Sequence, residues 1–368
     1  MADHPAKNSQ ASLQDDAKPQ PQRAGESQTT GSNSGESHRR SHAVQRKRAI
    51  VATLCLAVFV AVSLFGVNLI CNSFDNGSVS SATQHGNQDR SKLSDTEPFY
   101  VLLIGSDSRK GTALYTGRSS EHAQVDQHSD IMTLVRVDPV EYKITLVTIP
   151  RDTKMPGGDG KINDALLDND PDKVVSAVEN LLNVSISGYL MTDFASFPNF
   201  IDELGGLTLD VPKTITVSNP ATGEDIKVKA GKNQTLNGDQ VLALARARKQ
   251  YDTSQDAYRQ VNVRNIEKAI INKVLAMDST DSIRATIGYL RESCSSDIDY
   301  NSLAPIVMGF VENRDRITLY SCTGPYKGTN RESDGLWVCY EDADAWAKVM
   351  QAVDAGEDPS TVVEAPEF

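Results

Sequence analysis

The sequence predicts an α/β protein, a three-layer αβα arrangement with a central mixed β-sheet covered by helices on both faces, behind one N-terminal transmembrane helix. Apolar runs of strand length, such as 99–104 and 142–149, alternate along the chain with runs of helical spacing, such as 171–182 and 262–277. This alternation predicts the layers. Residues 49–71 carry no charge, which predicts the membrane helix.

The chain ahead of the apolar segment has a different composition from the rest. Residues 1–48 are rich in Gln, Ser, Gly, Asn and charged residues, so we expect a disordered tail. Residues 49–71 are long enough to span a bilayer core and too long for a typical cleavable signal peptide. Basic residues crowd their N-terminal side: Arg39, Arg40, Arg46, Lys47 and Arg48. The positive-inside rule therefore predicts a cytoplasmic N-terminus and an extracytoplasmic remainder.

The part beyond the membrane segment is expected to begin with a polar linker, residues 72–97, and to end in an acidic tail, residues 354–368. Between them, residues 98–353 are expected to form the folded domain. Further strands are predicted at 187–194, 207–211, 317–322 and 337–340, and helices at 171–182, 197–204, 237–245, 262–277, 282–290, 303–312 and 343–353.

Three cysteines lie in this outer part: Cys294, Cys322 and Cys339. An odd number allows at most one internal disulfide, and we favour Cys322 with Cys339 because the segment between them is polar and loop-like. Their spacing does not resemble a metal site. With a formal net charge of −12, the chain is not expected to have a nucleic-acid partner.

A predicted hairpin indicates which polar residues lie together in a candidate site. The runs 130–137 and 142–149 are joined by a short connection containing Pro139, so Asp130 should lie opposite Arg151. If the strand 99–104 runs parallel to 142–149, Asp107 reaches the same edge of the sheet. Two carboxylates and an arginine would then share one site, which is typical of metal-assisted phosphoryl chemistry.

Arginines recur later in the chain, at Arg246, Arg248, Arg259 and Arg264. One interpretation of Arg246 is structural, because a cation at a helix C-terminus satisfies free carbonyls. The other is functional: if the helix ends near Ala245, Arg246 and Arg248 point the same way and form a clamp for phosphate oxygens. The sequence leaves both open.

Five motifs together resemble the LytR-CpsA-Psr (LCP) family. They are Gly105-Ser106-Asp107-Ser108-Arg109, Ile149-Pro150-Arg151-Asp152, Leu204-Gly205-Gly206, Leu236-Asn237-Gly238-Asp239-Gln240 leading to Ala245-Arg246-Ala247-Arg248, and Asp256 followed by Arg259. The resemblance covers roughly residues 98–275. It implies a membrane-anchored bacterial phosphotransferase that moves a glycopolymer, of teichoic-acid or capsular-polysaccharide type, from a polyprenyl-pyrophosphate carrier to a peptidoglycan hydroxyl.

The resemblance also implies roles by position. Asp107, Asp130 and Arg151 would be catalytic, and the two aspartates would hold Mg²⁺, with Mn²⁺ as the alternative. The pyrophosphate would be bound by Arg151, Arg246, Arg248, Arg259 and His128. The supporting residues would be Asp152, Asp256 and Arg109. Asp130 is also a candidate base for the incoming hydroxyl.

Two positions depart from the family pattern. His128 stands where the family usually has Arg, and Val263 stands where it usually has Gln. His128 can still donate a hydrogen bond, whereas Val263 is expected in the helix core, with Gln260, Asn262 or Arg264 as replacements for the amide. Three functions remain open: the transferase, a hydrolase of the same lipid pyrophosphate, and a non-catalytic lipid-binding or regulatory membrane protein. For the lipid tail we expect an apolar groove along helices 262–277 and 197–204.

Overall fold

One edge of the main sheet brings together segments that are far apart in the sequence. The computed structural model describes residues 92–108, 127–251 and 255–363. All of them belong to the second of the two units, Met1–Asn76 and Gly77–Phe368, into which the chain divides. The expected tail, membrane segment and Arg109 lie outside the described residues, and the domain boundaries stay predictions. None of the helices within the described ranges has both the length and the apolar character to cross a membrane.

Six strands of the described chain form the main sheet, in the order β10-β3-β2-β1-β4-β9. Their bounds are β1 (Phe99–Ser106), β2 (Ser129–Asp138), β3 (Lys143–Thr148), β4 (Gly188–Thr192), β9 (Ser295–Ser296) and β10 (Thr318–Thr323). β2 pairs antiparallel with both β1 and β3, while β10 pairs parallel with β3 and β4 parallel with β1. The mixed sheet is therefore confirmed, and β1 and β3 run in the same direction as expected.

The β2–β3 hairpin is also confirmed. Thr133 pairs with Thr148, so the register carries Asp130 to the position opposite Arg151, just beyond the last paired residues. The C-terminal ends of β1, β3, β4 and β10 and the N-terminal end of β2 meet at this edge. Residues that follow these strands are thereby brought together although they are far apart in sequence.

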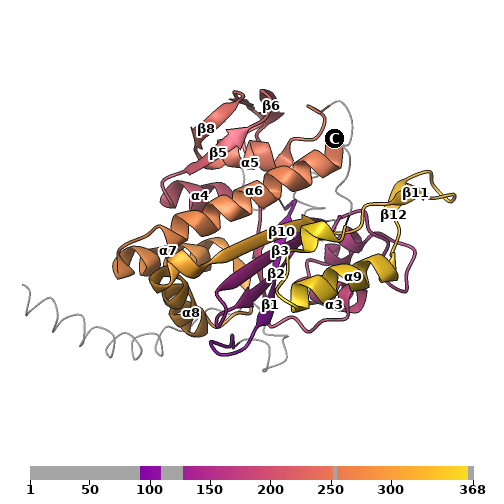
Figure 1. Cartoon of the computed structure of the whole chain (residues 1–368). Helices are drawn as coiled ribbons and strands as arrows, with labels where there is room; N and C mark the ends of the chain where they lie inside the picture. The colour runs from indigo at the N-terminus through magenta and orange to yellow at the C-terminus, as the bar shows by residue number, and fades with distance from the viewer. Residues whose placement is uncertain (1–91, 109–126, 252–254, 364–368) are drawn as a thin grey trace, which may run out of the picture. The chain divides into compact units, whose positions relative to one another are not determined.

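Helices cover both faces of the sheet (Figure 1). Their bounds are α3 (Pro171–Leu182), α4 (Ser196–Glu203), α5 (Gly238–Arg246), α6 (Gln255–Leu275), α7 (Thr280–Ser293), α8 (Tyr300–Glu312) and α9 (Ala343–Asp354). Alternate residues of β1 separate the two faces: Leu102 and Ile104 pack with α3 and α9, whereas Val101 packs with α8. α3 begins where the side chain of Asp170 caps the helix ahead of Pro171.

A smaller layer of helices and ribbons packs beside the edge of the sheet. Two two-stranded ribbons, β5 (Leu207–Val211) with β8 (Gly231–Leu236) and β6 (Ile215–Ser218) with β7 (Asp225–Val228), share a hydrophobic cluster with α4, α5 and α6. Asn237 caps α5 by accepting from the Gln240 N–H at 3.0 Å. A Cβ on Gly238 would lie 2.0 Å from the Pro198 carbonyl oxygen, so only glycine allows α4 and α5 to approach this closely. The glycine motif shared with the LCP family thus has a packing role.

The sequence missed several strands. β8 and β11 (Gly328–Asn330) are short and polar, and β6 and β7 alternate apolar and polar residues over only four positions each, the shortest run that marks a strand. α6 begins at Gln255 rather than at Asn262, because its first turn carries polar site residues.

The expected disulfide between Cys322 and Cys339 is wrong: both are free thiols. Cys322 lies in β10 and pairs with Val147, whereas Cys339 lies in β12 (Trp337–Cys339) beside Thr153. Burial raises the pKa of both thiols to about 12.

Candidate functional site

The ends of β1 and β2 hold two carboxylates side by side at the common edge. Asp107 follows β1, and its Oδ1 accepts a hydrogen bond from the His128 N–H at 2.9 Å, while its own N–H donates to the His128 carbonyl at 3.2 Å. These bonds fix the Asp107 backbone against the start of β2, where Asp130 lies. Burial raises the pKa of Asp107 and the nearby Asp130 charge adds to it, against the hydrogen bond from His128.

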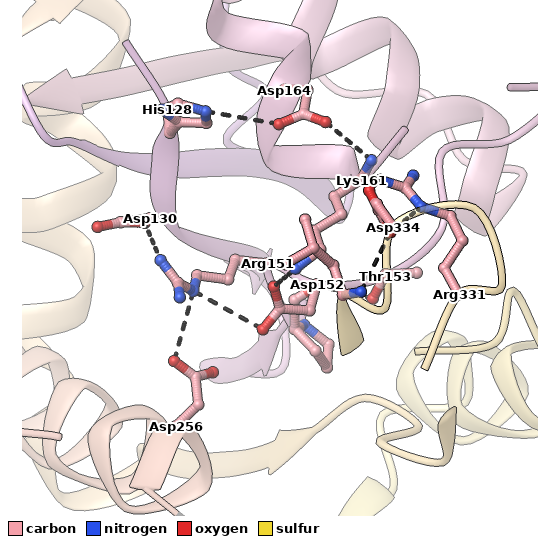
Figure 2. Close-up of polar contacts among 12 residues, drawn as sticks. His128, Asp130, Arg151, Asp152, Thr153, Lys161, Asp164, Asp256, Arg331 and Asp334 are labelled. Atoms are coloured by element: carbon pink, nitrogen blue, oxygen red, sulfur yellow. Dashed lines mark hydrogen bonds and ion pairs between the residues drawn. The ribbon is translucent and has the colours of Figure 1, made fainter. Parts of the chain in front are cut away.

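Arg151 is the hub of the site (Figure 2). Its Nη1 donates to Asp130 Oδ1 at 2.6 Å, and its Nε lies 3.5 Å from Asp256 Oδ1 and 3.8 Å from Asp152 Oδ2. Burial would lower the pKa of Arg151, but these three carboxylates outweigh it and raise the pKa. Asp152 is held in turn by Lys161, whose Nζ lies 2.6 Å from its Oδ1. The guanidinium is therefore fixed in orientation as well as charged.

A buried network on α6 completes this arrangement. Arg259 is 5% exposed; its Nε donates to Asp256 Oδ1 at 2.9 Å and its Nη1 donates to the Asp130 carbonyl oxygen at 2.8 Å. Gln260 donates to Asp256 Oδ2 at 3.0 Å and accepts from the Thr323 hydroxyl at 2.6 Å. Burial alone would raise the pKa of Asp256, but Arg259, Gln260 and Arg151 hold it below its ordinary value.

Two arginines at the C-terminal end of α5, Arg246 and Arg248, have different surroundings. Arg246, the last residue of α5, donates to the Ser218 carbonyl at 2.7 Å and stacks over the Phe194 ring at 4.7 Å. Arg248 lies near Arg151 and Arg259, and burial together with these two positive charges lowers its pKa. Among the described residues, none of the carboxylates forms a salt bridge with Arg248. A half-buried guanidinium beside two others favours an anion at this point.

An apolar cavity of about 760 Å³ opens onto this cluster. Its polar end includes Asp107, Asp130, Arg246, Arg248 and Arg259. Its walls come from one face of the sheet and from α4, α6, α7 and α8, with Val101, Leu146, Phe197, Phe200, Ile266, Ile270, Val274, Leu290 and Phe310 among the lining residues. The expected groove along α4 and α6 is therefore present, with α7 and α8 as walls that the sequence did not suggest.

Most of the predicted site residues lie together at one edge of the main sheet. Asp107, His128, Asp130, Arg151, Asp152, Arg246, Arg248, Asp256 and Arg259 all lie at this edge. Val263 is buried in the core, as expected. Of its suggested replacements, Gln260 joins the Asp256 network, whereas Asn262 donates to Leu244 and Tyr251 and Arg264 donates to Thr148.

Reasoning from the sequence overlooked two groups. Lys161 holds Asp152, and Asp164 Oδ1 lies 3.5 Å from His128 Nε2. Both follow the Pro150-Arg151-Asp152 segment in a loop that folds back on the edge through the Ile162 N–H to Thr153 carbonyl bond. A lysine and an aspartate shortly after that segment were the available signal, but nothing in their spacing marks them.

Asp107 and Asp130 are suitable ligands for a divalent cation. The Asp130 charge adds to the effect of burial in raising the pKa of Asp107, and a hard cation bound by both carboxylates would remove their repulsion. Mg²⁺ commonly uses one or two carboxylates together with substrate phosphates. No cluster of three or more His, Cys, Asp or Glu suited to a metal occurs in the described segments.

An αβα fold with an apolar cavity that ends in guanidinium groups defines a protein suited to an amphiphile with an anionic head. Residues 69–354 match the LytR_cpsA_psr family, and the chain belongs to that family.

One curated relative is the "Polyisoprenyl-teichoic acid--peptidoglycan teichoic acid transferase TagV" of Bacillus subtilis, 30% identical over 77% of this chain and 73% of that protein. The crystal structure of B. subtilis TagV superposes with a TM-score of 0.58 at 24% identity, over 71% of this chain and 97% of that one. A structure of TagT bound to LIIa-WTA gives 0.54 at 20% identity, over 76% and 96%. These superpositions show that the fold is shared.

Proposed function

We propose that this protein transfers a glycopolymer of teichoic-acid or capsular-polysaccharide type from a polyprenyl pyrophosphate to a peptidoglycan hydroxyl, releasing polyprenyl phosphate. The observation that carries the proposal is that the apolar cavity reaches Arg248 and Arg259, and that the charge of Arg151 lies close to Arg248. An isoprenoid tail gains about 0.8 kcal/mol for each methylene it buries, and its diphosphate would then lie at the guanidinium groups. The transferase name of the TagV relative agrees with this substrate.

The reaction forms one bond and breaks one. The acceptor hydroxyl oxygen bonds to the phosphorus next to the polymer sugar, the bridging P–O bond breaks, and the hydroxyl proton is released. Negative charge then grows on the departing polyprenyl phosphate. Arg151 and Arg259 stabilise that charge from positions that the carboxylates and carbonyls described above fix before the reaction, and the Arg248 guanidinium beside them adds its positive charge.

The carboxylates at the edge have two further tasks. Asp107 and Asp130 would hold Mg²⁺ or Mn²⁺, which when bound neutralises phosphate oxygens. Asp130 Oδ1 is held by Arg151, so a role as base for the hydroxyl falls to Oδ2. Asp152 and Asp256 orient Arg151 and Arg259, and His128 donates to a phosphate oxygen from beside Asp107. We place the site outside the cytoplasm, behind a membrane helix at residues 49–71.

The test is turnover by the purified full-length chain of a polyprenyl-pyrophosphate-linked saccharide, with and without a peptidoglycan acceptor. Polymer joined to the acceptor supports transfer. Release of saccharide that ignores the acceptor indicates the hydrolase, and binding without turnover indicates a lipid-binding protein. Chelation by EDTA should abolish turnover, and Mg²⁺ or Mn²⁺ should restore it.

Two substitutions, one in the guanidinium cluster and one control outside it, test the proposed site. Arg248→Gln should lower turnover by about 10²–10³-fold, because a positive charge at the leaving phosphate is lost. Arg284→Gln is the control: Arg284 pairs with Asp281 on the surface of α7. Equal turnover by both variants would contradict the proposed site.

A further inference from the structure

The β11–β12 ribbon exposes large apolar side chains beside the reacting edge. Leu336, Trp337 and Tyr340 are 53%, 41% and 51% exposed, whereas most large apolar side chains of the described segments are buried or half-buried. Gly328 pairs with Cys339 and Asn330 with Trp337, so the ribbon is a short two-stranded projection (Figure 1). Exposed aromatic rings gathered at one place are typical of a binding surface.

The ribbon is attached directly to the site. The Cys339 N–H donates to the Asp152 carbonyl at 2.8 Å, and the Lys154 N–H donates to the Cys339 carbonyl at 3.0 Å. These bonds tie β12 to the backbone immediately after Arg151. Trp337 lies on the same face of the strand as Cys339, two residues nearer the tip of the ribbon, where it pairs with Asn330.

The loop that joins β11 to β12 is also held against the segment that follows Arg151. Arg331 forms an ion pair with Asp334 and donates to the Asp159 carbonyl. In Figure 2 this pair lies beside Lys161, the residue that holds Asp152. These contacts therefore hold the ribbon in a fixed position beside this edge of the sheet.

The ribbon lies away from the cavity. The cavity is lined by α6, α7 and α8, and none of the described residues 328–340 is among its lining residues. Figure 1 shows the ribbon and the α7–α8 pair on different sides of the sheet. In phosphoryl transfer the attacking and leaving oxygens are roughly in line with phosphorus, on opposite sides of it. With the leaving lipid phosphate on the cavity side, the ribbon lies on a side from which the acceptor can approach.

Charge indicates what kind of partner the ribbon fits. Residues 331–344 contain five carboxylates, Glu332, Asp334, Glu341, Asp342 and Asp344, against the single Arg331. An anionic bilayer surface attracts basic segments and repels this one. Sugar rings suit it, because their C–H faces stack on aromatic rings while their hydroxyls donate to carboxylates.

We infer that the ribbon, with the exposed rings of Trp337 and Tyr340, binds the glycan strand of the acceptor and presents its hydroxyl to the phosphorus at Arg151. The inference rests on the proposed function, because it assigns the acceptor of that reaction. The donor is anchored by its tail and its diphosphate, so the acceptor is the reactant that needs a positioning surface.

Direct binding tests the inference without any turnover. The chain has two tryptophans, and Trp346 is 1% exposed, so a change in tryptophan fluorescence on adding soluble peptidoglycan glycan fragments reports on Trp337. We expect saturable quenching or a blue shift by the fragments and none by anionic vesicles. A response to vesicles alone, or to neither probe, overturns the inference.

Kinetics of the full-length chain distinguish the acceptor from the donor. Trp337→Ala should raise the acceptor KM about tenfold and leave the donor KM unchanged, while Trp337→Phe should retain most of the acceptor affinity. Val140→Ala, at an equally exposed apolar position in the β2–β3 turn, is the control. A rise in the donor KM alone, or an unchanged acceptor KM, overturns the inference. If the wild-type chain shows no transfer, the proposed function fails, but the fluorescence experiment still decides whether the ribbon binds glycan.

Discussion

The substitution Glu267→Gln is predicted to stabilise the protein at alkaline pH. Glu267 lies on α6 and lines the apolar cavity, and its Oε2 has no hydrogen-bond partner among the described residues. Burial raises the pKa of this carboxyl from 4.5 to about 7, although Thr133, Arg264 and Lys268 oppose the shift. At about 1.4 kcal/mol per pKa unit, ionising Glu267 in the folded state costs about 3 kcal/mol.

The direction in which stability changes with pH follows from proton binding by Glu267. Because the folded state holds this proton more tightly than the unfolded state, the stabilisation is complete below about pH 4.5 and is lost as the pH rises through about 7. Glu267→Gln removes this loss. The variant should match wild type at pH 5 and exceed it at pH 8 by up to about 3 kcal/mol in free energy of unfolding.

The assay is urea unfolding of the full-length chain at pH 5 and pH 8, comparing the variant with wild type at each pH. Glu203→Gln, at an exposed position on α4, controls for the loss of a surface charge. A second readout is the affinity for a polyprenyl phosphate, which should fall between pH 6 and pH 8 in wild type and change less in Glu267→Gln. If the difference in stability between variant and wild type is the same at both pH values, this account of the cavity wall is refuted.

Two further substitutions test the supports of the site. Asp256→Asn should destabilise the fold by about 3 kcal/mol at pH 7, because it leaves the buried Arg259 and the neighbouring Arg151 without their shared carboxylate. Since the pKa of Asp256 lies below its ordinary value of 3.8, its contribution is lost as the pH falls through that lowered pKa, so urea midpoints of variant and wild type should converge as the pH is lowered below 3.8. Gly238→Ala should cost about 3 kcal/mol through the clash with the Pro198 carbonyl; an unchanged melting temperature would contradict the packing of α4 on α5.

Much of the edge could be predicted from local sequence. The runs that became β2 and β3 carry their own turn between them, so the antiparallel register, and with it the meeting of Asp130 and Arg151, follows from chain connectivity. α3 was predicted with its correct bounds from the helical spacing of its apolar residues, and the structure shows that Asp170 caps its start ahead of Pro171.

Other parts carry no such local signal. Gln260 meets Thr323 across 63 positions of sequence, and Lys161 reaches Asp152 only because a loop folds back. The cysteine pairing failed for a related reason. Both Cys322 and Cys339 lie in strands, but those strands belong to different sheets, and spacing along the chain does not report that.

By itself, the sequence determined the alternation of strands and helices, the hairpin, and the motifs that place the chain in its family, because periodicity, turns and caps are properties of neighbouring residues. The tertiary structure alone decided that one face of the sheet leaves a cavity ending at three arginines, that an ionisable Glu267 lines it, and that an aromatic ribbon flanks the same edge. A cavity and its lining depend on how elements distant in sequence pack, and no local pattern specifies that packing.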